Sequence, residues 1–223
     1  SKEEPGMDKF LNAEGKPILE KMVQTIQENK GYLGDIDGLI GDGDHGMNMN
    51  KGFTMFWEQF GEKELSFTVG IGELGTLLFT QIGGSMGPIY GTIFTEMSDA
   101  GCDFEEIGIG EFTAMLEAGM NGLFEIVDAR VGDKTLVDTL SPSIDALKKA
   151  QAEGKNFNDA LSDMKAAAAA GRDSTVNLVA QFGRAARLGE RSRGVQDAGA
   201  ASCCLLLTAM ADGIQALLLG GIS

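Results

Sequence analysis

The 223-residue chain contains one histidine, one tryptophan, three cysteines and four prolines. Cys102 stands alone and Cys203 and Cys204 are adjacent in an apolar run, so the cysteines are reduced thiols and not a disulfide framework. Basic residues are also scarce, because 18 Lys and Arg face 33 Asp and Glu, which gives a formal net charge of −15. A strongly acidic chain is a poor partner for nucleic acid or for an anionic membrane surface.

Long apolar runs are also missing from the sequence. Residues 205–219 form an apolar stretch, but Asp212 and Gly213 interrupt it before it reaches the roughly 20 residues of a membrane span. The chain does not open with a positively charged, apolar signal segment. We therefore predict a cytoplasmic protein with no membrane association.

The alternation of apolar and polar residues that marks strands is absent too, and helical periodicity takes its place. Apolar residues recur at a spacing of three and four in residues 18–28 and again in residues 48–60. The remaining predicted helices cover residues 68–81, 89–99, 111–127, 136–151, 157–170, 176–186 and 198–218. The pattern predicts an all-α fold of about eight antiparallel helices in a closed barrel or bundle. We expect one helical domain over residues 8–223, after a disordered leader at residues 1–7.

The most informative segment is residues 37–50, which gathers three aspartates, the histidine and two asparagines. Asp42 and Asp44 share one glycine-flanked turn, and Asp37 lies close before it. Crowding of like charges costs free energy unless cations lie between the carboxylates. Oxygen ligands suit Mg²⁺ or Ca²⁺ better than zinc. The segment therefore predicts a site for hard divalent cations.

Two common motifs match this segment only in part. Residues 41–46 have the spacing G-x-G-x-x-G of a dinucleotide-binding turn, but aspartates in the variable positions would repel a phosphate unless metal intervened. An EF-hand loop counted from Asp35 fails, because its fifth and twelfth positions are Leu39 and Gly46. Asp35 itself is expected to face outward. A helix N-cap turn with solvated aspartates remains the alternative interpretation.

Glycines in residues 83–87 surround Ser85 and Met86, ahead of a helix expected to start near Pro88. Exposed amides at such a helix start can hold a phosphate or the edge of a base. A plain turn between two helices is the alternative. Local sequence does not decide between them.

Arginines are unevenly distributed, because five of the six fall within 22 residues. In an acidic chain this cluster indicates an anion site or a docking surface. An exposed helix end with Glu190 as a local partner is the alternative. The five residues are Arg172, Arg184, Arg187, Arg191 and Arg193.

Four motifs occur in order along the chain: GDGDHGMNM at residues 41–49, GGSMGPIYGT at 83–92, GDKT at 132–135, and GRAARLGERSRG at 183–194, followed by DAGA at 197–200. In combination they resemble the signature of the nucleotide-binding L subunits of dihydroxyacetone kinases. The resemblance covers residues 32–208. It implies an all-helical barrel that binds ADP or ATP at one end through two Mg²⁺ ions.

The resemblance also implies roles for individual residues. Asp37, Asp42 and Asp44 match the metal ligands. Two cations between carboxylates and phosphate oxygens neutralise the charge that resists phosphoryl transfer, so no further catalytic residue is expected. His45 and Arg184 are expected to contact the phosphates. The full set of implied nucleotide-binding residues is His45, Gly46, Met47, Asn48, Ser85, Met86, Leu136, Arg184, Asp197, Ala198 and Gly199, of which Leu136 and the last three border the adenosine.

The partners are implied by the same resemblance. A separate K subunit carries dihydroxyacetone covalently on a histidine, so this chain is expected to be inactive alone. A free-standing chain with residues 188–192 as LGERS favours ADP as a permanently bound cofactor, rephosphorylated by a phosphohistidine protein of the sugar phosphotransferase system. A homodimer is compatible with the sequence. The alternatives are a kinase subunit for a related ketose such as erythrulose, with ATP as an exchanging substrate, a nucleotide-bound regulatory module, and a metal-binding helical protein without nucleotide.

Overall fold

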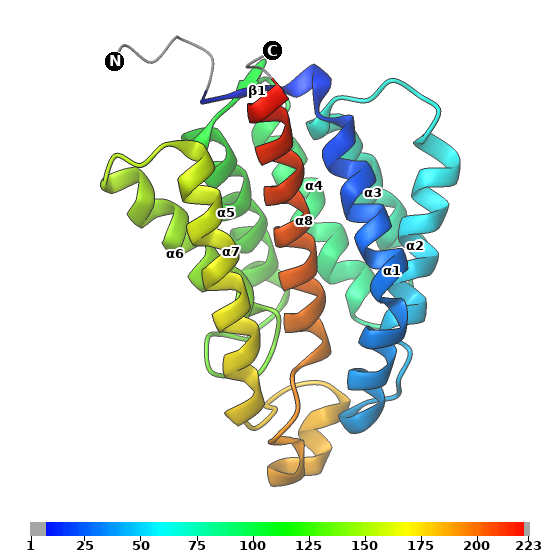
Figure 1. Ribbon diagram of the computed structural model, residues 1–223. Helices are drawn as coiled ribbons and strands as arrows, with labels where there is room; N and C mark the ends of the chain where they lie inside the picture. Colours follow the sequence, from blue (N-terminus) through cyan, green and yellow to red (C-terminus); the bar gives the residue numbers. More distant parts are fainter. Residues whose placement is uncertain (1–7, 221–223) are drawn as a thin grey trace.

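The computed structural model describes residues 8–220, and eight α-helices dominate this range (Figure 1). The predicted leader at residues 1–7 lies outside the described residues. The only strands in the described range, β1 (Phe10–Leu11) and β2 (Glu106–Ile107), pair antiparallel over two residues each. The all-α prediction is confirmed. The helices are α1 (Lys16–Ile40), α2 (His45–Phe60), α3 (Phe67–Gln81), α4 (Met86–Gly101), α5 (Ile109–Ile126), α6 (Val137–Ala152), α7 (Phe157–Ser174) and α8 (Ala198–Gly220).

The helices form a closed antiparallel ring, as predicted. Each helix packs against the next one along the chain, and α8 packs against α1, which closes the ring. Figure 1 shows that α1, α3, α5 and α7 run toward the lower end, and that α2, α4, α6 and α8 begin there. Buried side chains from all eight helices join in one apolar cluster.

Helix α1 is longer than the sequence predicts. Its first half has the expected apolar stripe, in which Ile18, Met22 and Ile26 are fully buried. The prediction ends the helix at residue 28, because glycines at 31, 34 and 38 weaken a helix. The helix nevertheless continues to Ile40, since Leu33 and Ile40 carry the buried stripe onward and tertiary packing outweighs the glycines. Asp37 therefore lies in the last turn of α1.

The predicted helix over residues 176–186 is wrong. The chain forms the short 3₁₀ helix η2 (Thr175–Asn177), then an irregular stretch, then the 3₁₀ helix η3 (Arg184–Ser192). Gly183 has a φ of +70°, a left-handed conformation that ends regular helix and that glycine adopts without strain. This segment, orange in Figure 1, lies beyond the lower end of the ring.

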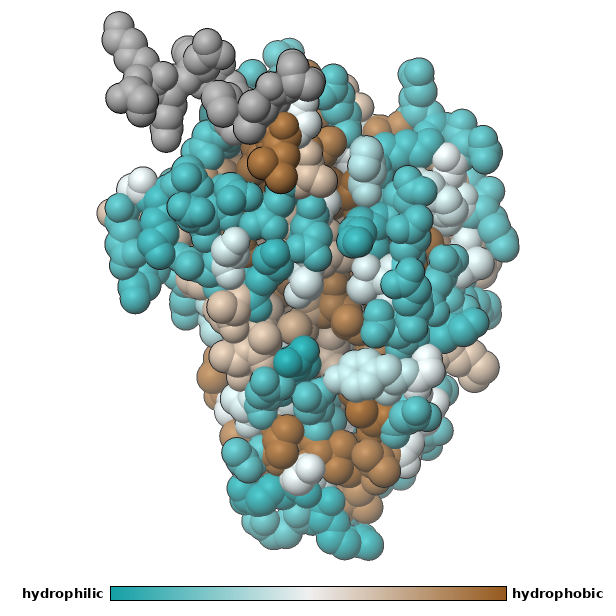
Figure 2. All heavy atoms as spheres, in the orientation of Figure 1, coloured by the Kyte–Doolittle hydropathy of each residue, from teal (hydrophilic) through white to brown (hydrophobic). Residues whose placement is uncertain are grey.

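Helix α8 is long and apolar enough to span a membrane, judged by length and composition alone, contrary to the prediction that no run qualifies. In the structure, 56% of its most apolar window is buried, and it packs between α1 and α7. That environment is typical of a core helix in a folded domain, so the apolar length is weak evidence for a membrane span. Figure 2 shows hydrophilic side chains over most of one face, with apolar side chains between them toward the lower end.

The backbones of helices α3 and α4 approach each other closely at Gly75. A Cβ built on Gly75 would lie 2.9 Å from the Thr95 nitrogen and 3.0 Å from the Gly91 oxygen. We predict that Gly75→Ala lowers the free energy of unfolding by about 1–3 kcal/mol, because the two backbones must separate. Gly31→Ala is the matched control: its Cβ would have nothing within 4 Å, so it should stabilise the helix by about 0.5–1 kcal/mol. Urea unfolding measures the free energy of unfolding of both variants. Equal values for Gly75→Ala and Gly31→Ala would contradict the close packing of α3 against α4.

Candidate functional site

All four sequence motifs meet at the lower end of the ring. The connections at this end are residues 41–44, 82–85, 127–136 and 175–197, and each contains or adjoins a motif. The same end holds the N-termini of α2, α4, α6 and α8. Helix N-termini carry partial positive charge and unpaired amides, so four of them at one end favour a bound anion.

Three carboxylates converge beside the start of α2. One oxygen from each of Asp37, Asp42 and Asp44 lies within 4.8 Å of the others. The turn is tight because Gly43 adopts a φ of +80°, and because Asp37 Oδ2 accepts a hydrogen bond from the His45 amide at 3.1 Å. An oxygen-only donor set of this size suits a hard divalent cation. Asp35 is exposed and lies outside this group.

The pKa values at this turn reflect the crowding of negative charge. Burial raises the pKa of Asp37 above its usual value. A hydrogen bond between the carboxyl groups of Asp42 and Asp44 lowers the pKa of Asp42 and raises that of Asp44. Arg184 adds a positive charge, with its Nε 3.1 Å from Asp42 Oδ2. The turn is therefore built to receive further positive charge.

His45 is the first residue of α2 and is 6% exposed. Its Nε2 is buried and has no hydrogen-bond partner among the described residues. Burial lowers the pKa of His45 to about 4, so the ring is neutral near pH 7. An unpaired buried polar atom costs free energy, which a ligand atom or a water at this position would recover.

Gly46 follows His45 in α2. A Cβ on Gly46 would lie 1.9 Å from the Lys30 oxygen, so only glycine lets α2 approach α1 this closely.

The glycine run at residues 83–87 forms the entry to α4. The helix begins at Met86, two residues before Pro88, and Ser85 occupies the N-cap position. The Ser85 side chain makes no capping hydrogen bond, and it is exposed. The first amides of α4 therefore have no side-chain cap and remain available to a ligand.

Leu136 and the start of α8 lie side by side. A Cβ on Gly199 would lie 3.7 Å from the Leu136 nitrogen. Asp197 Oδ2 accepts a hydrogen bond from the Ala200 amide at 2.9 Å, so this carboxylate caps α8. Burial raises the pKa of Asp197 to about 6. The sequence analysis expects Asp197 to border the adenosine. Capping of α8 is an additional role, and the position of an aspartate directly before a helix is a signal that could have predicted it.

The structure separates the arginines into different environments. Arg184 begins η3 and contacts the acidic turn. Arg193 pairs with Glu190 at 3.1 Å and also donates to the Asn177 oxygen, so it stabilises the 175–197 segment itself. Arg187 and Arg191 are exposed and make no ion pair with a described residue. These two are the ones left free to meet a partner.

Two residues that sequence reasoning did not assign also shape this end. Asp138, near the start of α6, accepts hydrogen bonds from the Gly132 amide at 2.7 Å and the Thr135 amide at 2.9 Å. Lys134 is 2% exposed and is the only non-glycine residue in the described range with a left-handed φ, at 65°. The GDKT motif marks this loop in the sequence, but the burial of its lysine is visible only in the structure.

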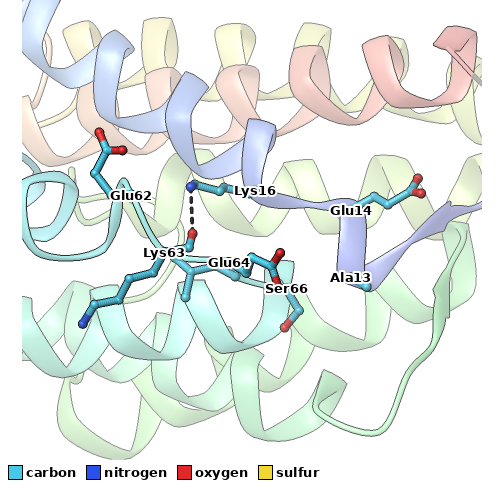
Figure 3. A pocket seen from close by; sticks show the side chains of 8 residues that line it. Ala13, Glu14, Lys16, Glu62, Lys63, Glu64 and Ser66 are labelled. Carbon is cyan, nitrogen blue, oxygen red and sulfur yellow. Dashed lines mark hydrogen bonds between the residues drawn. The ribbon is translucent and has the colours of Figure 1, made fainter.

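One surface pocket lies away from these motifs. It has a volume of about 510 Å³ and borders the start of α1, where Lys16 donates to the Lys63 oxygen at 2.7 Å (Figure 3). Its lining mixes lysines and glutamates and includes none of the predicted site residues. The second pocket, of about 420 Å³, lies beside the acidic turn and includes Gly43, Met47 and Asn50. Chemistry therefore favours the lower end over the larger pocket.

The cluster of three carboxylates leads to a prediction that can be tested with a metal ion alone, without nucleotide. Asp42→Asn, which preserves size and removes one charge, should weaken Mn²⁺ binding by at least about tenfold, or 1.4 kcal/mol. Asp35→Asn removes the same charge from an exposed position outside the group and should leave binding unchanged. Isothermal titration of each variant with MnCl₂ measures the difference. Equal affinities would show that the turn does not coordinate the cation.

Comparison with known proteins agrees with this arrangement. Residues 39–212 match the family model described as DAK2 domain. The chain is 39% identical over 188 residues to a Listeria innocua protein named PEP-dependent dihydroxyacetone kinase 1, ADP-binding subunit DhaL, covering 84% of this chain and 89% of that one. It is 33% identical to the Escherichia coli protein named PEP-dependent dihydroxyacetone kinase, ADP-binding subunit DhaL, covering 81% and 86%. A Mycolicibacterium smegmatis L-erythrulose 1-kinase is 30% identical over 87% of this chain, but over only 34% of its own length.

Solved structures show the same fold. The dihydroxyacetone kinase of C. freundii, in its native form, superposes with a TM-score of 0.69 at 22% identity, covering 95% of this chain. The structure of that kinase in complex with AMP-PNP and Mg²⁺ gives a TM-score of 0.65. This chain spans about a third of that protein's length, 37% and 36% in the two structures. With the motifs, the helical ring and these relatives in agreement, the chain belongs to the DAK2 domain family.

Proposed function

We propose that this chain is the nucleotide-binding subunit of a dihydroxyacetone kinase. It holds ADP or ATP with Mg²⁺ and passes a phosphoryl group to dihydroxyacetone bound on a separate K subunit. The observation that carries the proposal is the convergence of three carboxylates within 4.8 Å at the end of the ring where four helices begin. Carboxylates alone would repel a phosphate, whereas helix N-termini alone would attract one. The combination of carboxylates and helix N-termini therefore suits a phosphate that is bound through cations.

The acidic turn forms the phosphate end of the proposed site. Asp37, Asp42 and Asp44 would hold two Mg²⁺, which when bound neutralise the charge on the transferring phosphoryl group. The neutral His45 has one ring N–H to donate, and its buried Nε2 lacks a protein partner. Arg184 already reaches the oxygen of Asp42, so it lies within range of a phosphate at the turn. The backbone amides of Gly46 and Met47 would complete the phosphate site together with the side chain of Asn48, whose own amide donates to the Asp44 oxygen at 2.9 Å.

The nucleoside lies, in this proposal, against the starts of the three other helices. Ser85 and Met86 begin α4, Leu136 precedes α6, and residues 197–199 begin α8. The buried Leu136 contributes an apolar surface, while the small residues Ala198 and Gly199 leave room for a ring. Residues 8–223 then act as one nucleotide-binding domain.

The relatives' names bear on the donor and the partners. The Listeria and Escherichia proteins are named PEP-dependent, and they match this chain over most of their own length. These names support the part of the proposal in which ADP is a permanently bound cofactor of this chain, rephosphorylated by a phosphohistidine protein of the phosphotransferase system. The protein works in the cytoplasm, and a homodimer is compatible with the free surface of the ring.

An erythrulose kinase subunit is the second candidate. The relatives with that name are about three times longer than their match to this chain, so their substrate portion lies elsewhere. Substrate choice would therefore reside on the K subunit and not on this chain. A nucleotide-bound regulatory module is distinguished by reconstitution, because a regulator binds MgADP but supports no transfer.

The isolated chain should show no ketose kinase activity, because the described residues hold no second domain for a polyol and only one histidine. Activity should appear when a K subunit and a phosphoryl donor system are added. Mass spectrometry of nucleotide released on denaturation should find stoichiometric ADP in the purified protein. Phosphorylation of dihydroxyacetone by this chain alone would overturn the two-component proposal.

Arg187 and Arg191 should take part in docking of the K subunit, because they are exposed beside the site and unpaired among the described residues. Replacing both with Ala should leave MgADP affinity unchanged and slow reconstituted transfer, more at low salt, where charge steering is strongest. Replacing Lys21 and Lys149 with Ala is the control, because it removes the same net charge from exposed helix positions away from the site. An equal effect of both pairs would indicate a general effect of net charge.

A further inference from the structure

Lys134 combines two unfavourable features. Its side chain is 2% exposed, so its ammonium has lost most of its water. Its backbone has a φ of 65°, a conformation that costs free energy for a residue with a Cβ. Interactions elsewhere must offset both costs, which makes the contacts of this side chain informative.

The ammonium joins three separate segments of the chain. Lys134 lies in the loop between α5 and α6, and its Nζ donates to the carbonyl oxygens of Thr175 and Val195. Thr175 begins η2 after α7, and Val195 lies just before α8. Lys134 makes no ion pair with a described residue. Burial lowers its pKa, while the more distant carboxylates of Asp197 and Asp138 oppose that effect.

Further hydrogen bonds connect the same three segments. The Thr175 hydroxyl accepts from the Asp197 amide at 3.0 Å, and the Gly194 amide donates to the Val176 oxygen at 2.7 Å. Asp138 holds the loop on the other side through two of its amides. Lys134 is thus the one side chain that reaches both other segments from the α5–α6 loop.

We propose that Lys134 is a positioning residue, which sets nucleotide affinity by holding the α5–α6 loop, the end of α7 and the start of α8 in one arrangement. The inference rests on the proposed function, because Leu136 and residues 197–199 border the nucleoside in that proposal. Leu136 lies two residues after Lys134, and Asp197 lies two residues after Val195. Lys134 therefore acts through its neighbours, without touching the nucleotide.

The experiment compares two lysines whose ammonium groups each connect different segments of the chain. Lys134→Met keeps an unbranched side chain, one atom shorter, and removes its donors, so MgADP affinity should fall by at least about tenfold. Lys165→Met is the matched control: Lys165 Nζ donates to Asp212 at 2.8 Å and to Gln215 at 2.9 Å, between α7 and α8 and away from the motifs. It should leave MgADP affinity within about twofold of wild type, even if the unfolding temperature falls.

Hydrogen exchange of the ligand-free protein supplies a second readout. Lys134→Met should speed amide exchange jointly in residues 130–136 and 193–199, and leave α3 and α4 unchanged. Lys165→Met should not affect those two segments. A merely structural contribution to folding would lower overall stability without this local, paired pattern.

Each outcome separates the inference from the proposed function. If the wild-type protein binds no MgADP, both fail. If the wild type binds MgADP and Lys134→Met binds equally well, or if Lys165→Met loses as much affinity, only the inference fails. Lys134→Gln, which keeps one amide donor, is the milder variant and should show an intermediate loss. Failure of both Lys134 variants to fold would assign the residue to folding alone and overturn the inference.

Discussion

An antiparallel ring with an even number of helices places every second N-terminus at the same end. Here that end receives the starts of α2, α4, α6 and α8, together with all four motif-bearing connections. Residues separated by more than 150 positions, such as Asp42 and Gly199, meet at one end only because α8 packs against α1 and closes the ring. The site is therefore a consequence of ring closure, and any change that opens the ring would disperse it.

The electrostatics of this end contain two opposed tendencies. Four helix N-termini attract an anion, while Asp37, Asp42 and Asp44 repel one. Burial raises the pKa of Asp37, and the hydrogen bond with Asp42 raises that of Asp44. Divalent cations between carboxylates and phosphate oxygens satisfy both sets at once. In the proposed function, this arrangement would favour a metal-bound phosphate over either component by itself.

Sequence reasoning succeeds where side-chain pattern alone carries the information. The buried stripe that starts α1 and the crowding of Asp42 and Asp44 are both patterns of this kind. It fails where tertiary packing overrides local preference, as at the glycine-rich second half of α1. It also fails where one backbone conformation is incompatible with a predicted helix, as at Gly183 within residues 176–186.

Lys134 illustrates a deeper limit of sequence reasoning. Its partners are the carbonyl oxygens of Thr175 and Val195, and every residue carries such an oxygen. No residue type at positions 175 or 195 therefore indicates the contact. Asp138 presents the same difficulty, because it binds backbone amides in the loop before it. The second layer of the site is built on backbone atoms, and only the folded ring reveals it.

The contact between Arg184 and Asp42 connects the two halves of the site. Arg184 opens η3, and the segment from 175 to 197 is attached to the ring mainly by hydrogen bonds, including those of Lys134. The Arg184 side chain is 68% exposed, and exposed ion pairs of this kind contribute at most about 1 kcal/mol. In the proposed function, a divalent cation at Asp42 would compete with Arg184 for the same oxygen, with twice the charge. Arg184 would then lie beside the acidic turn with its guanidinium available to the phosphate oxygens, which is the role that the proposed function gives it.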